Sequence, residues 1–435
     1  MVSLLLPIIY LAFISLGLPD ALLGAAWPSM YPQLGAGVAW AGGVSMIISA
    51  GTIVSSLASE RLNTRLGTGR VTALSVATTA VALFGFSTCT QFWQLCLWAI
   101  PYGLGAGSVD AALNNYVALH YESRHMSWLH CMWGIGAAGG PVIMGWALAG
   151  STWQNGYRII SILQIVLTAV LIFSLPLWQT PTDAGAGEDF TPEHRTLPQL
   201  MKVPGVPEVM GCFALYNGLE AVAGIWAASY CTLVRGLDAT TAASWASLFY
   251  LGITGGRFLS GFLTMRFTDH QMIRLGQTLI AVGIALLLLP GSAALPVGLV
   301  VIGLGCAPIY PCIIHETPAN FGKNLSMAMT GIQMAAAYVG VTLLSPFFGV
   351  LAQNITMQLY PWALLVMLLL MVVLSAAQKD SRASGGEGLN KASLVKGRCR
   401  ALAKAEGFLP GCGCDEQLWH GPSESPRPPT ASTSL

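Results

Sequence analysis

Three acidic residues stand inside long apolar stretches of this 435-residue chain, at Asp20, Asp110 and Glu220. Placing a charge in an apolar, membrane-like segment costs several kcal/mol. We therefore treat each acid in such a segment as a candidate functional residue. Desolvation disfavours the ionised form of a carboxyl group, which allows it to take up and release a proton near neutral pH. We therefore expect Asp20 and Asp110 to bind and release protons.

Polar residues accompany Asp110 at helical spacing. Asn114 lies four residues after Asp110 and shares its helix face, together with Gly103 and Gly107, while Asn115 lies one step round the helix. That face combines a proton-binding acid with carboxamide donors and acceptors. Such groups suit a sugar or another polyol.

Polar residues share a helix face in two other places. Asn217, Glu220 and Gly224 lie at i, i+3 and i+7, and His130 lies three residues before Trp133. Tryptophan rings can stack on a sugar ring. The same residue types also pack and hydrogen-bond neighbouring membrane helices, so a purely structural role stays open for each of them. The expected solute-binding residues are Asn114, Asn115, His130, Trp133, Asn217, Glu220, Gln333, Trp27 and Trp226.

The elements that must position these residues are membrane helices. Hydrophobic residues make up 54% of the chain and charged residues only 9%, against roughly 25% in soluble domains, and the mean hydropathy is +0.63. A spanning helix needs about 20 apolar residues. We expect twelve spans, at roughly 4–31, 38–57, 69–88, 92–119, 126–149, 157–178, 207–234, 241–265, 272–290, 295–315, 323–352 and 357–377.

The basic residues orient these spans. All of the 20 Lys and Arg residues except Arg158 and Arg235 fall after even-numbered spans, in the central loop or in the tail. Basic loops stay in the cytoplasm, so both termini are expected there, in a plasma or bacterial inner membrane. Five of these residues are expected to form gating contacts at the cytoplasmic face, although simple anchoring also explains them: Arg61, Arg65, Arg70, Arg257 and Arg266.

The two halves of the chain repeat each other at an offset of about 200 residues. Asp20-Ala21-x-x-Gly24 matches Glu220-Ala221-x-x-Gly224, and Gly103-Leu-Gly-Ala-Gly107 matches Gly303-Leu-Gly-Cys-Ala307. The sequence predicts an all-α polytopic membrane protein with two pseudo-symmetric six-helix bundles. The expected divisions are an N-terminal bundle at 1–179, a cytoplasmic linker at 180–206, a C-terminal bundle at 207–377 and a disordered cytoplasmic tail at 378–435.

Several classes of function are excluded by composition and motifs. A net charge of +1 gives no support for nucleic-acid binding. The ten cysteines form no disulfide framework, and no Walker-type phosphate loop is present, so ATP does not drive the protein directly. We expect no cofactor and no metal.

The membrane portion, roughly 1–377, resembles the major facilitator superfamily, and within it the fucose–proton symporter family. The resemblance rests on Asp110-Ala-Ala-Leu-Asn114-Asn-Tyr116, on Asp20 in the first span and on Ile135-Gly-Ala-Ala138. Superfamily-like segments also occur at Pro308-Ile-Tyr-Pro311 and at Gly256-Arg257 with Gly261 and Arg266. The family usually has Glu where this chain has Asp110.

The resemblance implies twelve helices, alternating access and proton-coupled uptake, with Asp20 and Asp110 as the coupling carboxylates. We expect a monomeric symporter, not an enzyme, whose partners are protons, the lipid bilayer and a small polar solute, in particular a monosaccharide. One alternative is a proton-antiporting exporter of amphipathic compounds. Another is a membrane sensor, or a membrane-embedded enzyme that uses Asp110 and His130 as an acid–base pair.

Overall fold

The computed structural model describes residues 4–37, 40–178 and 195–378. Within these ranges every regular element is a helix. The chain divides into two compact units, Met1–Ser381 and Arg382–Leu435. The second unit lies outside the described residues, as do almost all of the predicted tail and residues 180–194 of the predicted linker.

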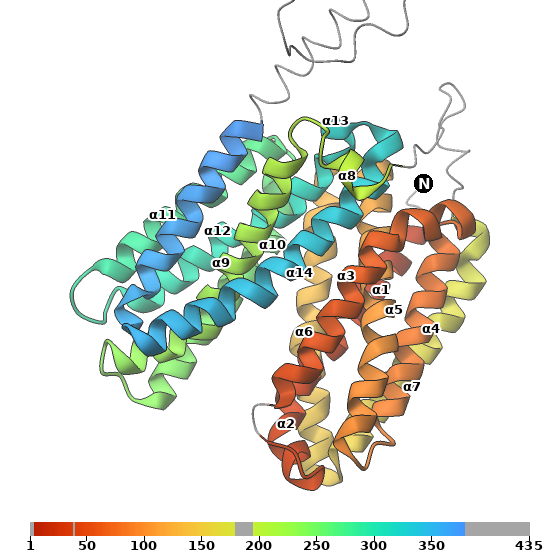
Figure 1. Ribbon diagram of the computed structural model, residues 1–435, viewed down its shortest axis with the longest axis horizontal. Coiled ribbons are helices and arrows are strands. Elements are labelled where there is room, and N and C mark those ends of the chain that lie inside the picture. The colour runs from red at the N-terminus through yellow and green to blue at the C-terminus, as the bar shows by residue number, and fades with distance from the viewer. Residues whose placement is uncertain (1–3, 38–39, 179–194, 379–435) are drawn as a thin grey trace, which may run out of the picture. The chain divides into compact units, whose positions relative to one another are not determined.

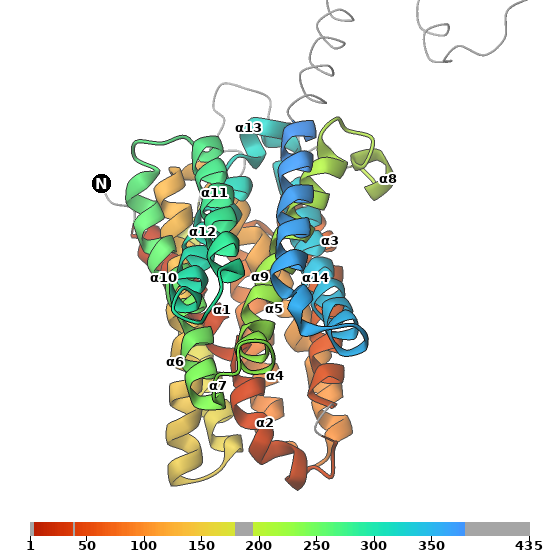
Figure 2. The same cartoon turned by 90° about the vertical axis from the view of Figure 1, so that its left-hand side faces the viewer.

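The helices of the first unit appear in Figures 1 and 2. In the N-terminal half they are α1 Leu5–Asp20, α2 Leu22–Gln33, α3 Trp40–Leu66, α4 Thr68–Phe86, α5 Phe92–His120, α6 Ser123–Gly150 and α7 Trp153–Ser174, followed by the 3₁₀ turn η1 Leu175–Leu177. In the C-terminal half they are α8 Leu197–Leu200, α9 Val206–Leu233, α10 Ala239–Leu263, α11 Asp269–Leu288, α12 Leu295–His315, α13 Thr317–Phe321 and α14 Lys323–Asn354. The turn η3 Met357–Leu359 and a last helix at 360–378 complete this half.

The predicted membrane fold is confirmed within the described residues. Ten helical segments are long and apolar enough to cross a bilayer, among them α1 with the start of α2, and the last helix. α5 and α10 are also long enough, and each carries charged or amide residues that lower its hydropathy: Asp110, Asn114 and Asn115 in α5 and Arg257 in α10. Together they make the twelve spans of the predicted fold.

The first span is broken at Ala21, which the sequence analysis did not anticipate. α1 ends at Asp20 and α2 begins at Leu22. Pro19 has no backbone N–H to donate to the carbonyl of Ser15, and the side-chain amide of Gln164 from α7 donates to that oxygen instead, at 3.0 Å. The Ser15 carbonyl is therefore satisfied without the missing proline N–H, and the break leaves the Asp20 carboxylate at a helix end.

The stretch 58–68, which the expected spans leave as a connection, is almost entirely helical. α3 continues to Leu66 and α4 begins at Thr68, so Arg61 and Arg65 lie on α3 and Arg70 lies on α4. Only Gly67 separates the two helices, with a φ of 79°, a conformation that glycine adopts without strain. This tight junction fixes the direction in which α4 leaves α3.

Close helix contacts follow the internal repeat. A Cβ atom at Gly103 of α5 would lie 2.3 Å from the Ile48 carbonyl oxygen of α3. At the repeat-related position, a Cβ at Gly303 of α12 would lie 2.2 Å from the Phe249 carbonyl oxygen of α10. In each half the fourth span therefore packs against the second through a glycine, as small residues allow in membranes.

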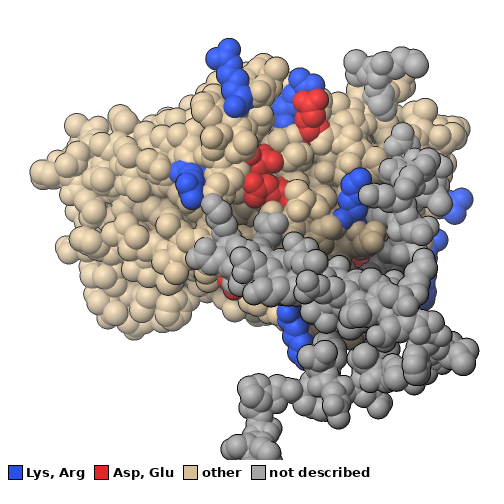
Figure 3. All heavy atoms as spheres, turned by 90° about the horizontal axis from the view of Figure 1, so that it is seen from above, with Lys and Arg blue, Asp and Glu red and all other residues tan. Residues whose placement is uncertain are grey.

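One end of the first unit, called here the basic end, carries Arg61, Arg65, Arg70, Arg124 and Arg266. Figure 3 looks onto this end, where Lys and Arg side chains are spread over the surface. The N-terminal and C-terminal halves meet near it. Asn115 of α5 accepts a hydrogen bond from Ser326 of α14 at 2.5 Å, and a Cβ at Gly331 of α14 would lie 2.5 Å from the Ser56 carbonyl oxygen of α3.

Candidate functional site

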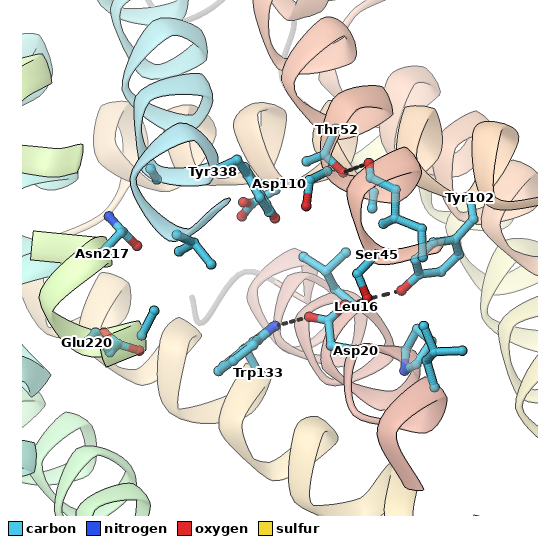
Figure 4. Close-up of a pocket in the computed structure, with 18 of the residues that line it drawn as sticks. Leu16, Asp20, Ser45, Thr52, Tyr102, Asp110, Trp133, Asn217, Glu220 and Tyr338 are labelled. Atoms are coloured by element: carbon cyan, nitrogen blue, oxygen red, sulfur yellow. Dashed lines mark hydrogen bonds between the residues drawn. The ribbon is translucent and has the colours of Figure 1, made fainter. Parts of the chain in front are cut away.

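A cavity of about 430 Å³ lies between helices of both halves. Residues from all seven helices of the N-terminal half, α1 to α7, line it on one side, and residues from α9, α10, α12 and α14 of the C-terminal half line it on the other. In Figure 4, Asn217 and Glu220 face the cavity from the side opposite Asp20. Of the predicted solute-binding and proton-coupling residues, Asp20, Asp110, His130, Trp133, Asn217 and Glu220 line this cavity.

Asp20 faces the cavity from the break between α1 and α2. Its Oδ2 accepts a hydrogen bond from Nε1 of Trp133 at 2.8 Å, and its Oδ1 accepts one from the hydroxyl of Tyr102 at 3.2 Å. Figure 4 shows both bonds. Two donors aimed at one carboxyl group keep it in a fixed direction at the cavity wall.

Asp110 belongs to a buried chain of polar side chains. The Nδ2 of Asn114 donates to Oδ1 of Asp110 at 2.7 Å, and Oδ1 of Asn114 lies 3.0 Å from Nε2 of His130. An amide oxygen only accepts, so Nε2 of His130 is the donor in this arrangement. Asn114 is fully buried and does not line the cavity, so it holds Asp110 and His130 in place from behind.

The glycines of α6 bring Trp133 to Asp20. A Cβ at Gly136 would lie 2.1 Å from the Ile14 carbonyl oxygen, and one at Gly140 would lie 2.0 Å from that of Leu18. Both glycines therefore let α6 lie directly against α1. Trp133, one turn before Gly136, then reaches the carboxylate at the end of α1.

Glu220 is paired with an arginine that the sequence analysis placed elsewhere. Arg257 was counted among the basic residues at the cytoplasmic face, but it lies inside α10, is 4% exposed and lines the cavity. Its Nη2 is 3.6 Å from Oε1 of Glu220, and the hydroxyl of Tyr216 hydrogen-bonds the other carboxylate oxygen. The loop position predicted for Arg257 is wrong, because the Glu220 carboxylate and the ring of Trp133 accommodate its charge inside the protein.

Two predicted binding residues hydrogen-bond between elements instead of lining the cavity. Asn115 joins α5 to Ser326 of α14. Gln333 is 1% exposed and its Oε1 accepts a hydrogen bond from Thr317 at 3.0 Å, which ties α13 to α14.

The two predicted stacking tryptophans also lie outside the cavity lining. Trp27 is 6% exposed and packs near Tyr31 and Phe92. Trp226 donates to the Ser345 carbonyl at 3.2 Å and packs edge-on to Phe348. The remaining predicted gating residues, Arg61, Arg65, Arg70 and Arg266, lie at the basic end and are at most partly buried.

Tyrosines are the main site residues that sequence reasoning missed. Tyr102, Tyr157, Tyr250, Tyr310 and Tyr338 all line the cavity. Tyrosine is common in membrane helices and at their interfaces, so its presence in a span carries no signal. Arg257 could have been found, because an arginine inside the apolar run 241–265 is as unusual as the acids.

The family model of the Major Facilitator Superfamily matches residues 9–243 and 209–409. Since these matches cover most of the sequence, the chain belongs to this superfamily. The protein is therefore a multi-pass membrane transporter and not an enzyme, and the predicted family is confirmed.

Individual relatives are distant. The chain is 22% identical over 282 residues to Bypass of stop codon protein 6 of Saccharomyces cerevisiae, covering 60% of this chain and 56% of that protein. It is 24% identical over 297 residues to the glucose/mannose transporter GlcP of Bacillus subtilis, covering 64% and 71%. The chain thus spans little more than half the length of the yeast relative.

A solved structure of FucP, the fucose:proton symporter of E. coli, in its outward conformation has the same fold. The TM-score is 0.71 at 14% sequence identity, and the match covers 87% of this chain and 98% of FucP.

Proposed function

We propose that this protein is a proton-coupled symporter that imports a small polar solute of the monosaccharide class. The observation that carries the proposal is the convergence of Asp20, Asp110 and Glu220, from three separate helices, on one cavity between the two halves. Acids in membrane helices that face a shared cavity are the usual groups of proton relays. Asp20 and Asp110 carry the transported proton, and Asn114 orients Asp110.

The lining of the cavity supports a sugar-like solute. Trp133 and the five tyrosines offer flat apolar faces beside hydroxyl groups, and Asn217 adds an amide. Aromatic faces beside polar edges match a sugar ring, which is apolar on its faces and hydroxylated round its edge. The names of GlcP and FucP, both sugar transporters, point the same way.

Alternating access is supported by where the halves touch. The contacts Asn115–Ser326 and Ser56–Gly331 lie between the cavity and the basic end. The basic end faces the cytoplasm by the positive-inside rule, which puts both termini there. The cavity then corresponds to an outward-facing state, and residues 1–179 and 207–377 rock against each other about it. The protein acts as a monomer in the cell membrane.

The test measures proton uptake by proteoliposomes that contain the purified protein, with a pH-sensitive dye inside. Hexoses, deoxyhexoses, pentoses and amphipathic cations are added in turn. We expect inward proton flux with one sugar class, and loss of that flux in Asp110→Asn with solute exchange retained. Asp238→Asn is the matched control, because Asp238 caps α10 through the N–H of Thr241, outside the cavity.

Two results would contradict the proposal. Proton flux that occurs only with amphipathic compounds, in the opposite direction to the solute, would identify an exporter. Sugar uptake that proceeds without proton movement in the wild type would remove the coupling role of Asp20 and Asp110.

A further inference from the structure

Among the residues that the structure describes, Arg257 is the one arginine or lysine that lines the cavity. This residue is 4% exposed. Its Nη2 lies 3.6 Å from Oε1 of Glu220, which is longer than the distances in a bidentate arginine–carboxylate pair. Its Nε is buried without a hydrogen-bond partner among the described residues. An unpaired buried donor costs about 1–3 kcal/mol. Since Glu220 makes only one long contact with this guanidinium, the part of Arg257 that lines the cavity can still donate to an acceptor on a ligand.

The same guanidinium is linked to the proton-binding side of the cavity. Its carbon atom lies 5.5 Å from the centre of the Trp133 ring, a cation–π distance. Trp133 in turn donates to Asp20 at 2.8 Å. The order Glu220, Arg257, Trp133, Asp20 therefore runs from the C-terminal half to the N-terminal half through the cavity wall.

We propose that Arg257 binds the transported solute directly, that this solute is uncharged and rich in hydroxyl groups, and that Trp133 positions Arg257 relative to Asp20. This inference rests on the proposed symport and extends it to a residue and a charge class.

The charges round the cavity select the uncharged solute. Within the described part of the chain, its acidic residues are Asp20, Asp110 and Glu220, and Arg257 is the single arginine or lysine. Once protons occupy Asp20 and Asp110, the remaining Glu220–Arg257 pair is neutral. A solute that adds a charge would then be buried without a counter-charge, which is costly. A hydroxyl group both donates and accepts, so it can take the Arg257 N–H groups and still donate to a carboxylate.

The experiment measures binding to the purified protein by calorimetry and proton uptake in proteoliposomes. The neutral probes are D-glucose, D-mannose and L-fucose, and D-glucuronate and D-glucosamine are charged analogues of glucose. The variants are Arg257→Gln, the double variant Arg257→Gln with Glu220→Gln, and Trp133→Phe. Arg235→Gln is the matched control, because Arg235 also lies over a ring, that of Tyr230 at 5.4 Å, outside the cavity.

We expect the wild type to bind a neutral hexose more tightly than either charged analogue. Arg257→Gln should weaken that binding by roughly 10- to 100-fold, the loss of a charge-assisted hydrogen bond. The double variant removes both charges together and so leaves none unpaired; its binding should be as weak. Trp133→Phe keeps a ring beneath Arg257 and removes the donor to Asp20, so the number of protons moved per solute should fall. Arg235→Gln should match the wild type.

Three results would overturn the inference while the proposed symport stands. They are hexose binding by the folded double variant at wild-type strength, tighter binding of D-glucuronate than of glucose, and unchanged proton coupling in Trp133→Phe. Failure of the wild type to bind or transport any neutral hexose would instead overturn the monosaccharide proposal, and the inference with it.

Discussion

At the scale of single residues, Asn114 connects two groups that face the cavity. It donates to Asp110 at 2.7 Å and lies 3.0 Å from Nε2 of His130. Asn114→Leu keeps a similar volume and leaves both groups unpaired, at about 1–3 kcal/mol for each buried polar group. We expect a lower midpoint of thermal unfolding in detergent and slower solute-driven proton uptake.

Two control variants distinguish the loss of these buried hydrogen bonds from the mere removal of an amide side chain. His130→Gln keeps an N–H that can reach Asn114 and should be milder. Asn354→Leu removes an exposed amide that bonds the carbonyl of Val350 in its own helix, and should change little. An unfolding midpoint in Asn114→Leu equal to that of Asn354→Leu would show that the buried chain contributes nothing.

The rarity of a residue type decided how much of the site could be predicted. Asp20, Asp110 and Glu220 stand out because acids are costly in membrane helices, and all three line the cavity. Trp27 and Trp226 were assigned to the solute but pack elsewhere. One sequence shows which residues share a helix face, and it does not show which neighbouring helix that face meets.

At the scale of helices, glycine contacts set the position of the site. A Cβ at Gly140 would lie 2.0 Å from the Leu18 carbonyl oxygen, whereas one at Gly145 on the same helix meets nothing within 4 Å. Gly140→Ala must push α6 away from α1, at about 1–3 kcal/mol, and draw Trp133 from Asp20. We expect a lower unfolding midpoint and impaired proton uptake in Gly140→Ala. Gly145→Ala should be neutral or slightly stabilising; equal midpoints would contradict this packing role.

The helices themselves were largely predictable, and their irregularities were not. The twelve spans follow from apolar length and from the placement of basic residues, which are properties of the local sequence. The break at Ala21 also depends on Gln164 of α7, which bonds the Ser15 carbonyl. That partner lies 149 residues away, so no local pattern could reveal it.

At the scale of the whole transporter, a polar cluster joins the halves near the basic end. His315 at the end of α12 places Nδ1 2.6 Å from Oδ2 of Asp269 and Nε2 3.2 Å from the Tyr121 carbonyl oxygen. Ser123 of α6 also hydrogen-bonds Asp269. A carbonyl and a carboxylate only accept, so both ring nitrogens of His315 act as donors and the ring is positively charged. The cluster therefore stabilises contact between the halves on this side.

Alternating access requires this cluster to open when the basic end opens. Asp269→Asn weakens it, and a loss of about 1–2 kcal/mol shifts the balance of states roughly 5- to 30-fold. In hydrogen–deuterium exchange we expect faster exchange at 119–127 and 264–271, and slower exchange at the opposite end, at 150–153 and 234–238. Glu122→Gln is the control, since the exposed Glu122 pairs with Arg124 on its own half and surface pairs contribute little. Faster exchange at the basic end without protection at the other end would mean local loosening, and would contradict a coupled movement of the two halves.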